Sequence, residues 1–569
     1  MAPVSSAPAP VVGPDDLLLT RALHFARTTP DRTWLFQPVG DGVVEEYSWS
    51  RALDEARRLA AWLRTLDLPP GSAIAMLAKN SAHFPIFELA IWMAGHVTVA
   101  LYPTLTAHSV QQILEHSGAK LCFVGKLDGW SSMKGGIPAS LPTFACKLSP
   151  ADARERFPLW EDLVAHHLPI TDDPRPDPDA LAVIMYTSGS TGTPKGVMHS
   201  HRTMATPPIG YAKEFRLGAH HRLFSYLPLS HTLERTLVMA TSMAHGASMY
   251  FNQSLETFNA DLKKARPTLF FSIPRLWLRF QAAVYEKQPK AKLDRLLRIP
   301  IVRGIVGKRV LEQLGLDSVQ MAFTTSAPLP ADVIAWFESL GLTMIEGFGM
   351  TEDFGYSHRS TPGHTKAGWV GEPAPGVTSR IGDNGELQVK TPTAMLGYFN
   401  APELDAEAFT TDRYLRTGDR GEFDAMGRLR LTGRVKELFK TSKGKYVAPA
   451  PIENALNGSG LVEQSCVMGE GQGQPFAVVM LNAVARAETR SAEGRAALVA
   501  RLRKVRDTVN AALDPHERLQ LLAVAREEWT IGAGLLTPTM KIKRAAIEAR
   551  YRAFMDRWYG NKDAVQFEE

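Results

Sequence analysis

The first part of the chain alternates between the hydrophobic periods of helices and strands. Apolar residues recur at helical spacing from Trp49 to Leu66, and a Pro-Pro-Gly turn follows. Short apolar runs typical of buried strands come next, at 73–77, 97–101 and 121–124, with a helical stretch at 110–116. Such alternation predicts parallel sheets that are covered by helices.

The pattern changes in later segments. Residues 130–178 are rich in Pro, Asp and Ser, which predicts surface connections, and a strand at 181–186 then runs into a Gly/Ser/Thr loop. Short strands with Gly and Asp turns between 366 and 433 indicate a small β-rich part. The remainder is typical of a separate α+β unit, in which the charged stretch 490–528 is predicted to be helical.

These patterns together predict an α/β fold in two domains. The large N-terminal domain spans residues 1–433 and contains two parallel-type α/β subdomains, 1–178 and 179–365, followed by the β-rich part, 366–433. A small α+β C-terminal domain takes up residues 434–569.

Composition excludes several classes of protein. A chain of 569 residues with 45% hydrophobic and 22% charged residues is ordinary for a soluble globular protein with several domains. The net charge of +5 is too small to indicate nucleic acid binding, although it suits anionic ligands such as nucleotides or lipid headgroups. The three cysteines are far apart, which favours a reducing compartment and neither zinc nor disulfides.

The N-terminal segment and the apolar runs indicate the compartment. The first residues are rich in Pro, Ala and Ser, lack the features of a signal peptide, and predict a flexible lead-in. No apolar run reaches the roughly 20 residues that span a bilayer. We therefore expect a cytoplasmic protein. Peripheral contact with the inner membrane face and a homodimer both remain compatible with the sequence.

The strongest chemical signal is the loop after the predicted strand 181–186. It contains Thr187, Ser188, Gly189, Ser190, Thr191, Gly192 and Lys195. Glycines allow backbone N–H groups to approach an anion, hydroxyls add donors, and a lysine meets a phosphate oxygen. The spacing differs from that of the Walker loop, and an ordinary polar turn is the alternative. The density of hydroxyls beside a lysine favours a phosphate-binding loop.

The segment Tyr186–His201 resembles the signature loop of the adenylate-forming superfamily, which includes acyl-CoA synthetases, luciferases and peptide-synthetase adenylation domains. Further matching segments follow in the family's order, at 226–231, 347–352, 414–419, 433–434 and 536–544. The resemblance implies that ATP activates a carboxylic acid as an acyl-adenylate with release of pyrophosphate, and that the acyl group then passes to coenzyme A. It also implies that the C-terminal domain is mobile.

Roles toward the triphosphate follow from the resemblance. It implies that Glu352, with the hydroxyl of Thr187, binds Mg²⁺ and that Thr351 contacts phosphate. Lys195 would neutralise phosphate charge. His231 would lie beside the carboxylate and the α-phosphate, although a lone histidine is more often structural.

Roles toward the nucleoside are implied in the same way. The segment Gly347, Phe348, Gly349, Met350 would border the base, with Phe348 stacked on adenine in a position where many relatives carry Tyr. Ser326 and Ala327 resemble a less glycine-rich form of the segment beside adenine. Asp419 would accept hydrogen bonds from the ribose hydroxyls, and Arg434 would contact the ribose.

The C-terminal segments carry the remaining implied roles. Lys541 matches the family's catalytic lysine, with Lys543 as the alternative and Met540 in a position where many relatives have Gly. Lys436 falls where the family places its hinge. The cationic segment 439–446 would approach the nucleotide in one domain position and the thiol tunnel in the other.

The identity of the acid is inferred from weaker signals. The segments 226–235, 271–277 and 440–449 resemble long-chain fatty acyl-CoA synthetases. Met239, Met243, Met249 and Tyr250 either line an apolar tunnel or belong to the core. Two alternatives remain: an acyl-AMP ligase that loads a carrier protein or activates a β-hydroxy acid, and a non-catalytic nucleotide-binding protein.

Overall fold

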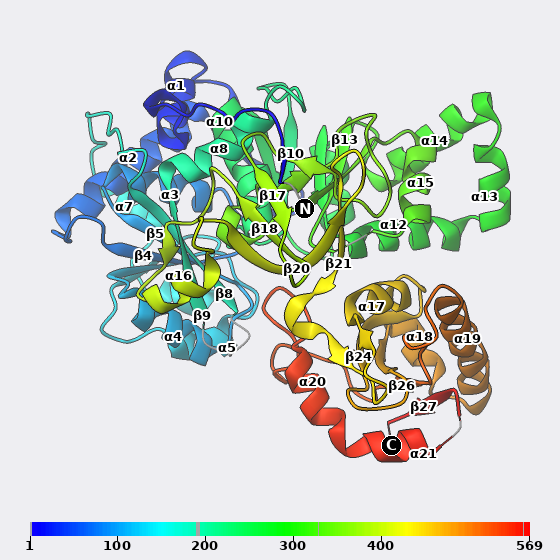
Figure 1. The fold of residues 1–569 in the computed structure, drawn as a ribbon. Coiled ribbons are helices and arrows are strands. Elements are labelled where there is room, and N and C mark those ends of the chain that lie inside the picture. Colours follow the sequence, from blue (N-terminus) through cyan, green and yellow to red (C-terminus); the bar gives the residue numbers. More distant parts are fainter. Residues whose placement is uncertain (1–2, 189–193, 328, 562, 569) are drawn as a thin grey trace.

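The computed structural model describes residues 3–188, 194–327, 329–561 and 563–568. A large N-terminal domain lies beside a smaller C-terminal domain, and the chain passes between them after β21 (Leu429–Arg434) (Figure 1). This arrangement confirms the predicted fold class. The proposed subdomain boundaries stay predictions.

A large sheet carries the strand that leads into the Gly/Ser/Thr loop. Its order is β19-β9-β8-β5-β4-β6-β7. The strands are β4 (Ala73–Leu77), β5 (Val97–Leu101), β6 (Leu121–Val124), β7 (Thr143–Ala145), β8 (Leu181–Ser188), β9 (Pro194–Ser200) and β19 (Gly397–Tyr398). Strands β4 to β8 pair in parallel, whereas β9 pairs antiparallel with β8 and β19. Helix α2 (Trp49–Thr65) precedes β4, whereas α3 (His83–Met93) and α4 (Ala107–Ser117) connect β4 to β5 and β5 to β6.

The prediction that residues 130–178 only connect elements on the surface is wrong. Thr143–Ala145 forms the edge strand β7, and Trp160 at the start of α7 (Trp160–His166) is 2% exposed. Phe144 packs against Phe123, with 4.9 Å between the ring centroids. A few aromatic residues therefore bury this segment despite its polar composition.

Two further sheets each combine parallel strands with antiparallel strands at one edge. The first has the order β10-β11-β2-β3 and the second β12-β13-β14-β15-β16. The strands of the first are β2 (Thr33–Gly40), β3 (Val43–Ser48), β10 (Arg222–Ser225) and β11 (Ser248–Phe251). Those of the second are β12 (Leu269–Ser272), β13 (Met321–Thr324), β14 (Met344–Phe348), β15 (His358–Arg359) and β16 (Glu372–Pro373). The antiparallel pairs are formed by strands that are consecutive in sequence.

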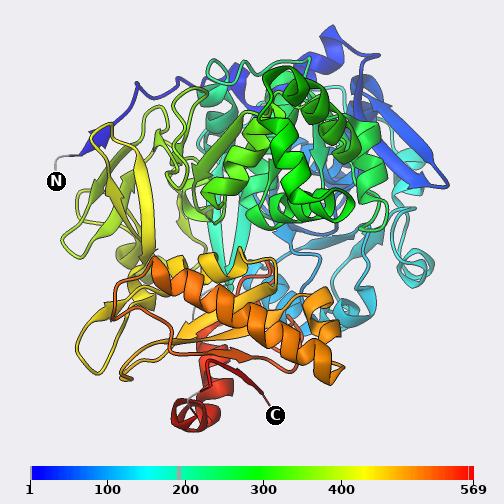
Figure 2. The same ribbon diagram turned by 90° about the vertical axis from the view of Figure 1, so that its right-hand side faces the viewer.

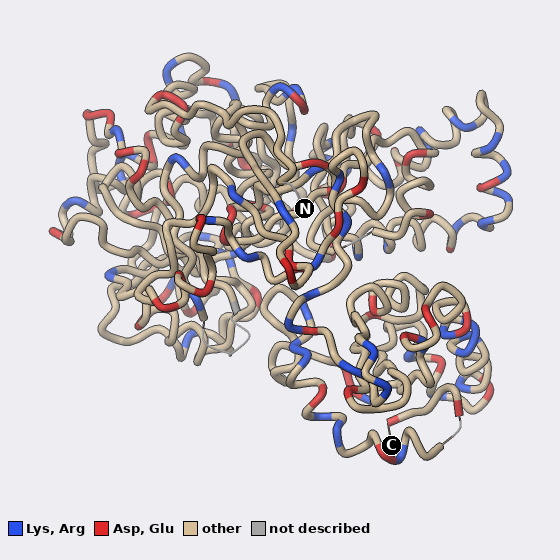
Figure 3. Tube along the Cα trace, in the orientation of Figure 1, with Lys and Arg blue, Asp and Glu red and all other residues tan. Residues whose placement is uncertain are grey.

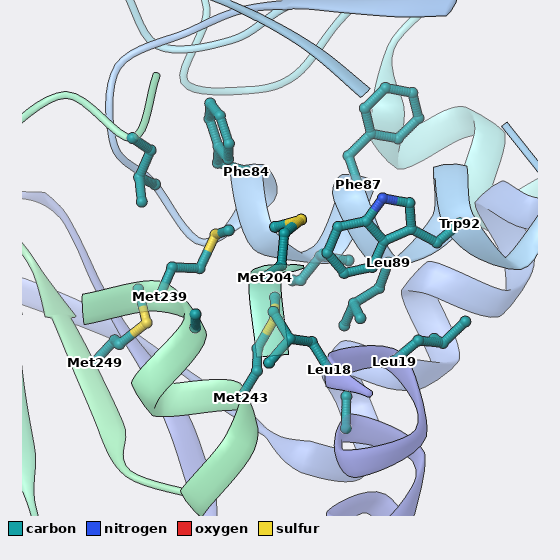
Figure 4. Packing of buried hydrophobic residues seen from close by; sticks show 14 of the residues in the cluster. Leu18, Leu19, Phe84, Phe87, Leu89, Trp92, Met204, Met239, Met243 and Met249 are labelled. Carbon is teal, nitrogen blue, oxygen red and sulfur yellow. The ribbon is translucent and has the colours of Figure 1, made fainter. Parts of the chain in front are cut away.

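The methionines of the proposed acyl tunnel belong to the core. Met239, Met243 and Met249 have no exposed surface, and Figure 4 shows them packed with Met204 and Phe84. Tyr250 is also buried, in a neighbouring cluster. In the structure these side chains therefore pack in the core and do not line a tunnel.

The β-rich part includes a strand from the N-terminus. The sheet has the order β1-β17-β18-β20-β21, and its other strands are β1 (Val4–Ser5), β17 (Thr378–Ile381), β18 (Glu386–Lys390) and β20 (Leu415–Phe423). Val4 pairs with Ser379 and Ser5 with Thr378. The expectation of a flexible lead-in is therefore wrong at these two residues, because the open edge of β17 supplies hydrogen-bonding partners.

The C-terminal domain is an α+β unit. A hairpin of β22 (Phe439–Lys440) and β23 (Tyr446–Val447) precedes a sheet of β24 (Val462–Met468), β25 (Phe476–Leu481), β26 (Leu522–Val524) and β27 (Val565–Phe567). Helices α17 (Pro449–Asn457) and α19 (Ala492–Ala511) pack on this sheet, and Figure 2 shows α19 in front. The predicted helix over 490–528 is too long, because Leu522–Val524 is a buried strand.

The other α-helices in the described part of the chain are α1 (Leu18–Thr28), α5 (Trp130–Met133), α6 (Ala151–Arg156), α8 (His201–Tyr211), α9 (Thr232–Glu234), α10 (Thr241–His245), α11 (Phe258–Ala265), α12 (Pro274–Lys287), α13 (Lys290–Leu297), α14 (Pro300–Leu314), α15 (Ala331–Leu340), α16 (Pro402–Ala408), α18 (Ala483–Glu488), α20 (Arg544–Tyr551) and α21 (Met555–Gly560). Among the described residues, no helix combines the length and the apolar character that crossing a bilayer requires.

Candidate active site

The two strands that flank the Gly/Ser/Thr loop form a β-hairpin. Strands β8 and β9 pair antiparallel, and Thr187 lies opposite Lys195. The hairpin therefore brings the hydroxyl of Thr187 and the ammonium of Lys195 to the same end of the large sheet. Ser188 ends β8, while Gly189, Ser190, Thr191 and Gly192 lie outside the described residues.

Tyr398 connects this hairpin with Glu352. Its strand β19 pairs with β9, and its hydroxyl donates a hydrogen bond of 2.8 Å to Oε1 of Glu352. The Nζ atom of Lys195 lies 5.4 Å from the centroid of the Tyr398 ring. The backbone N–H of Met395 also donates to the carbonyl of Glu352, at 2.8 Å. The carboxylate is thus held close to the lysine of the loop.

Thr351 is tied to two other elements. Nε2 of His199, in β9, is 2.7 Å from the carbonyl oxygen of Thr351, and the hydroxyl of Thr232 is 3.2 Å from that of Thr351. Burial lowers the pKa of His199 to about 4, so the ring is neutral and donates from Nε2. Asp353, two residues after Thr351, is buried and accepts hydrogen bonds from the backbone N–H groups of Met350 and Gly355.

The segments proposed to border the base meet at the carboxyl edge of parallel strands. Thr324 of β13 pairs with Glu346 of β14. Ser326 lies two residues after Thr324 and Phe348 two residues after Glu346, so both are at the same edge of the sheet. Ser326 adopts a left-handed backbone with φ of 75° and is exposed, as is Ala327. In open α/β sheets ligands bind at this kind of edge.

The glycines of the 347–352 segment allow a close approach of two chains. A Cβ atom on Gly349 would lie 2.6 Å from the backbone of Gly355, whereas on Gly347 it would lie 3.4 Å from the carbonyl oxygen of His358. The turn after β14 is therefore built around Gly349. Phe348 is half-buried, and its ring centroid is 6.3 Å from that of His358.

Asp419 and Arg434 face each other across a strand pair. They are direct partners in the register of β20 and β21, and Nε of Arg434 is 3.0 Å from Oδ1 of Asp419. Burial raises the pKa of Asp419, and the positive charges of Arg434 and Lys541 oppose that effect.

His231 is oriented by the helix that follows it. Its Nδ1 accepts a hydrogen bond of 3.1 Å from the backbone N–H of Leu233 and caps α9. Burial, and secondarily the charge of Lys541, lowers the pKa of His231 to about 4. The neutral ring then carries its proton on Nε2. Behind it, Arg235 and Glu88 form a fully buried ion pair, and Nε of Arg235 donates to the carbonyl of Leu229 at 3.2 Å.

The loop that carries Lys541 has a defined shape. Thr537 donates to the carbonyl of Lys541 and accepts from its N–H, at 2.8 and 3.1 Å respectively. Met540 adopts the left-handed region with φ of 63°, which explains why glycine suits this position. Arg544, three residues after Lys541, donates to both carboxylate oxygens of Glu453 at 2.8 Å. This ion pair attaches the loop to the rest of the C-terminal domain.

Lys541 lies between the two domains. The protein around it lowers its pKa, Arg434 acts in the same direction, and the carboxylates of Asp419, Glu437 and Glu352 oppose the shift. Its side chain retains exposed surface. Thr104 of the N-terminal domain donates to the carbonyl of Pro538 at 3.1 Å, and Arg279 is 3.4 Å from Glu463. The structure thus brings the predicted C-terminal lysine toward Asp419 and Glu352.

Lys436 lies in the connection between the domains. It is part of the short 3₁₀ turn Val435–Glu437, directly after β21. Residues 439–446 form the β22–β23 hairpin and its turn.

Sequence reasoning missed Tyr398, His199 and Glu437 as parts of this site. Tyr398 is one of 13 tyrosines, and nothing in its local sequence distinguishes it from the others. His199 lies within the matched loop segment, but its own sequence does not show that β9 places it beside Thr351. The pairing of β9 with β19 places Tyr398 here, and the contact of β9 with Thr351 places His199.

Two family models match long stretches of the chain. A model of the family "AMP-binding enzyme" matches residues 23–399, and one of the "AMP-binding enzyme C-terminal domain" matches residues 437–563. The Long-chain-fatty-acid–CoA ligase FadD15 of Mycobacterium bovis is 27% identical over 98% of this chain and 99% of its own. Long-chain-fatty-acid–CoA ligase 1 of Homo sapiens is 29% identical over 86% of this chain and 78% of its own.

A solved structure shares the fold. It is the A domain of the carboxylic acid reductase from Segniliparus rugosus in complex with AMP and a co-purified carboxylic acid, with 23% identity and a TM-score of 0.78 over 96% of this chain and 94% of that one. The two family models together span both domains. The chain belongs to the AMP-binding enzyme family of adenylate-forming ligases.

Proposed function

We propose that this protein activates a long-chain fatty acid with ATP and transfers the acyl group to coenzyme A. The observation that carries the proposal is the position of Lys541, which reaches from the C-terminal domain toward Asp419, Arg434 and Glu352. Anionic reactants need cations that are held in place before the reaction, and a lysine delivered by a second domain meets that need.

In the first half-reaction, a carboxylate oxygen of the acid attacks the α-phosphorus of ATP. The bond to the bridging oxygen breaks and pyrophosphate leaves. Lys541 stabilises the charge that develops around the α-phosphorus, while Lys195 and the hydroxyl of Thr187 hold the β- and γ-phosphates. The resemblance to the family's signature loop implies phosphate binding by the rest of the loop, of which Gly189, Ser190, Thr191 and Gly192 lie outside the described residues. His231 donates from Nε2 to the carboxylate of the acid.

The nucleoside would lie along the carboxyl edge of β13 and β14. Ser326, Ala327 and the segment 347–350 border the base, with Phe348 against its face. Asp419 accepts from the ribose hydroxyls, and Arg434 contacts the sugar while it neutralises Asp419.

Glu352 is the group most suited to magnesium. Among the described residues, no cluster of three or more metal-binding side chains occurs. Mg²⁺ in nucleotide sites is held by one or two carboxylates together with phosphate oxygens and water, so a single carboxylate near the loop fits this ion. Thr187 and Thr351 would add hydroxyl oxygens. The bound ion would neutralise phosphate charge, and Tyr398 would orient the Glu352 carboxylate for it.

In the second half-reaction, the sulfur of coenzyme A attacks the acyl carbon and AMP leaves. We propose that the C-terminal domain rotates about Lys436 between the two steps, which exchanges Lys541 for the hairpin 439–446 at the site. A few residues in a connection are enough to absorb such a rotation.

The choice of a long-chain acid is supported by the names of the relatives at 27% and 29% identity, together with the segments 226–235, 271–277 and 440–449. In the domain position that the structure describes, the methionines near the site are packed in the core. A long chain would therefore require these flexible side chains to repack.

The test measures pyrophosphate exchange and AMP release with acids from C2 to C20, with and without coenzyme A. We expect exchange with long acids alone and AMP release that requires coenzyme A. Lys541→Ala should reduce exchange by roughly 100-fold or more, whereas the neighbour Lys543→Ala should change it little. Exchange without any transfer to coenzyme A would favour the ligase that loads a carrier protein. No exchange with any acid would refute the proposal.

A further inference from the structure

Helices α13 and α14 form a basic corner at the edge of the N-terminal domain. The corner comprises residues 290–314 and projects beyond the sheet β12-β13-β14-β15-β16 (Figure 1). It contains seven Lys and Arg against two Asp and Glu, so that its formal charge of +5 equals that of the entire chain. Figure 3 shows the Lys and Arg positions along this edge.

These basic residues are not used to pair with carboxylates of the protein. Lys290 lies 5.2 Å from the ring centroid of Tyr285, and none of the seven forms an ion pair with a carboxylate in the described part of the chain. Asp294 is held by a hydrogen bond of 3.3 Å from the hydroxyl of Tyr285. The positive charge of the corner therefore faces solvent.

The same corner exposes large apolar side chains. Ile301 is 83% exposed, Ile305 56% and Ile299 46%. Ile301 and Ile305 are four residues apart in α14 and so lie on one face, which Lys308 and Arg309 extend. Single exposed apolar residues are common on protein surfaces. Here three exposed isoleucines lie within seven positions, among arginines and lysines, and form an apolar patch.

Folding does not account for these isoleucines. The inner face of α14 is already packed, since Val310 and Leu311 are buried and a Cβ on Gly307 would lie 2.6 Å from the carbonyl oxygen of Leu340. On α13, the buried side chains of Leu293 and Leu297 pack in the same hydrophobic cluster. The isoleucines are an additional apolar surface on the outer side.

We propose that the basic corner docks on an anionic lipid surface. Isoleucines enter the boundary between headgroups and acyl chains, and the surrounding lysines and arginines attract the negative headgroups. A nucleic acid would match the charge but would leave the isoleucines without a role. This docking surface does not depend on the proposed function. If that function holds, docking places the enzyme at the lipid surface in which long-chain acids dissolve.

The test is flotation of the full-length protein with vesicles of phosphatidylcholine that contain phosphatidylglycerol, and with vesicles of phosphatidylcholine alone. We expect binding to the anionic vesicles that weakens with salt. Ile301→Ser with Ile305→Ser should lower binding by about tenfold or more. Arg295→Gln, Arg298→Gln and Arg303→Gln should lower it by roughly fivefold for each charge.

Two control variants match these changes elsewhere on the surface. Lys120→Gln, Arg154→Gln and Lys213→Gln remove three exposed charges, and Leu168→Ser with Leu255→Ser removes two leucines that are 83% and 82% exposed. Both should bind vesicles like the parent protein. Pyrophosphate exchange should be unchanged in every variant, which separates docking from catalysis.

Several outcomes would overturn the inference. They are absence of binding to anionic vesicles, an equal loss in the control variants, and full binding by the isoleucine variant. Duplex DNA binding that depends on the arginines but not on the isoleucines would instead identify a nucleic acid surface. If the parent protein binds vesicles but activates no acid, the proposed function fails while the docking surface stands.

Discussion

The buried ion pair between Glu453 and Arg544 should control both the stability of the C-terminal domain and the placement of Lys541. The Glu453 side chain is 9% exposed and that of Arg544 13%. Besides its two bonds to Arg544, the carboxylate accepts a hydrogen bond of 2.7 Å from the backbone N–H of Val467. Burial raises the pKa of Glu453, and Arg544 opposes that shift.

Glu453→Gln is the informative change because it preserves the size of the side chain. The amide oxygen can still accept from Val467, but the buried guanidinium of Arg544 then loses its closest carboxylate. It keeps Glu437, whose Oε2 lies 3.5 Å from its Nη2. Breaking a buried pair in this way costs about 3–5 kcal/mol. Since Arg544 is three residues from Lys541, adenylation should fall together with stability.

Hydrogen exchange of the amides in β24 and β25, followed by mass spectrometry, measures the local effect. A loss of about 3 kcal/mol corresponds to exchange that is roughly 100-fold faster in these strands, with the N-terminal domain unchanged. Glu528→Gln is the control, because Glu528 pairs with Arg486 at 3.1 Å but is 63% exposed, so its loss should cost less than about 1 kcal/mol. Adding Arg544→Met to Glu453→Gln should recover much of the protection. Equal exchange in the two single Gln variants would refute this reasoning.

Three further predictions concern the active-site loops. Met540→Ile should reduce pyrophosphate exchange more than Met540→Gly, because a β-branched residue is poorly accommodated at φ of 63°; equal rates would show that the left-handed turn is not required. Burial raises the pKa of Asp353 to about 7, above its unfolded value near 3.8, so the folded protein keeps a proton that the unfolded chain has lost and stability falls as pH rises through this window. Asp353→Asn should therefore flatten the decline of Tm between these pH values, and an unchanged slope would assign the decline to other groups. Gly349→Ala should abolish most exchange, because its Cβ would lie 2.6 Å from the backbone of Gly355, whereas Gly347→Ala at 3.4 Å should be tolerated; the opposite order would contradict the geometry.

The sequence identified the local elements and the chemistry of the site. The apolar runs at 73–77, 97–101 and 121–124 coincide with β4, β5 and β6, because a short, uniformly apolar run between turns has few alternatives to a buried strand. The motifs of the adenylate-forming family were readable for the same reason: each is a local arrangement of glycines, hydroxyls and charges. Their order along the chain was enough to identify the family.

Only the tertiary structure decided which of these local signals meet. Tyr398 reaches Glu352 because β19 joins the edge of a sheet built almost 200 residues earlier, and Val4–Ser5 becomes a strand because β17 offers an open edge. Whether Met239 lines a tunnel or fills the core depends on neighbours from distant helices. Local composition determines what a residue is able to do, whereas long-range packing determines which partners, solvent and charges surround it. Lys541 is the clearest case, because the position of its side chain near Asp419 depends on the relative position of the two domains.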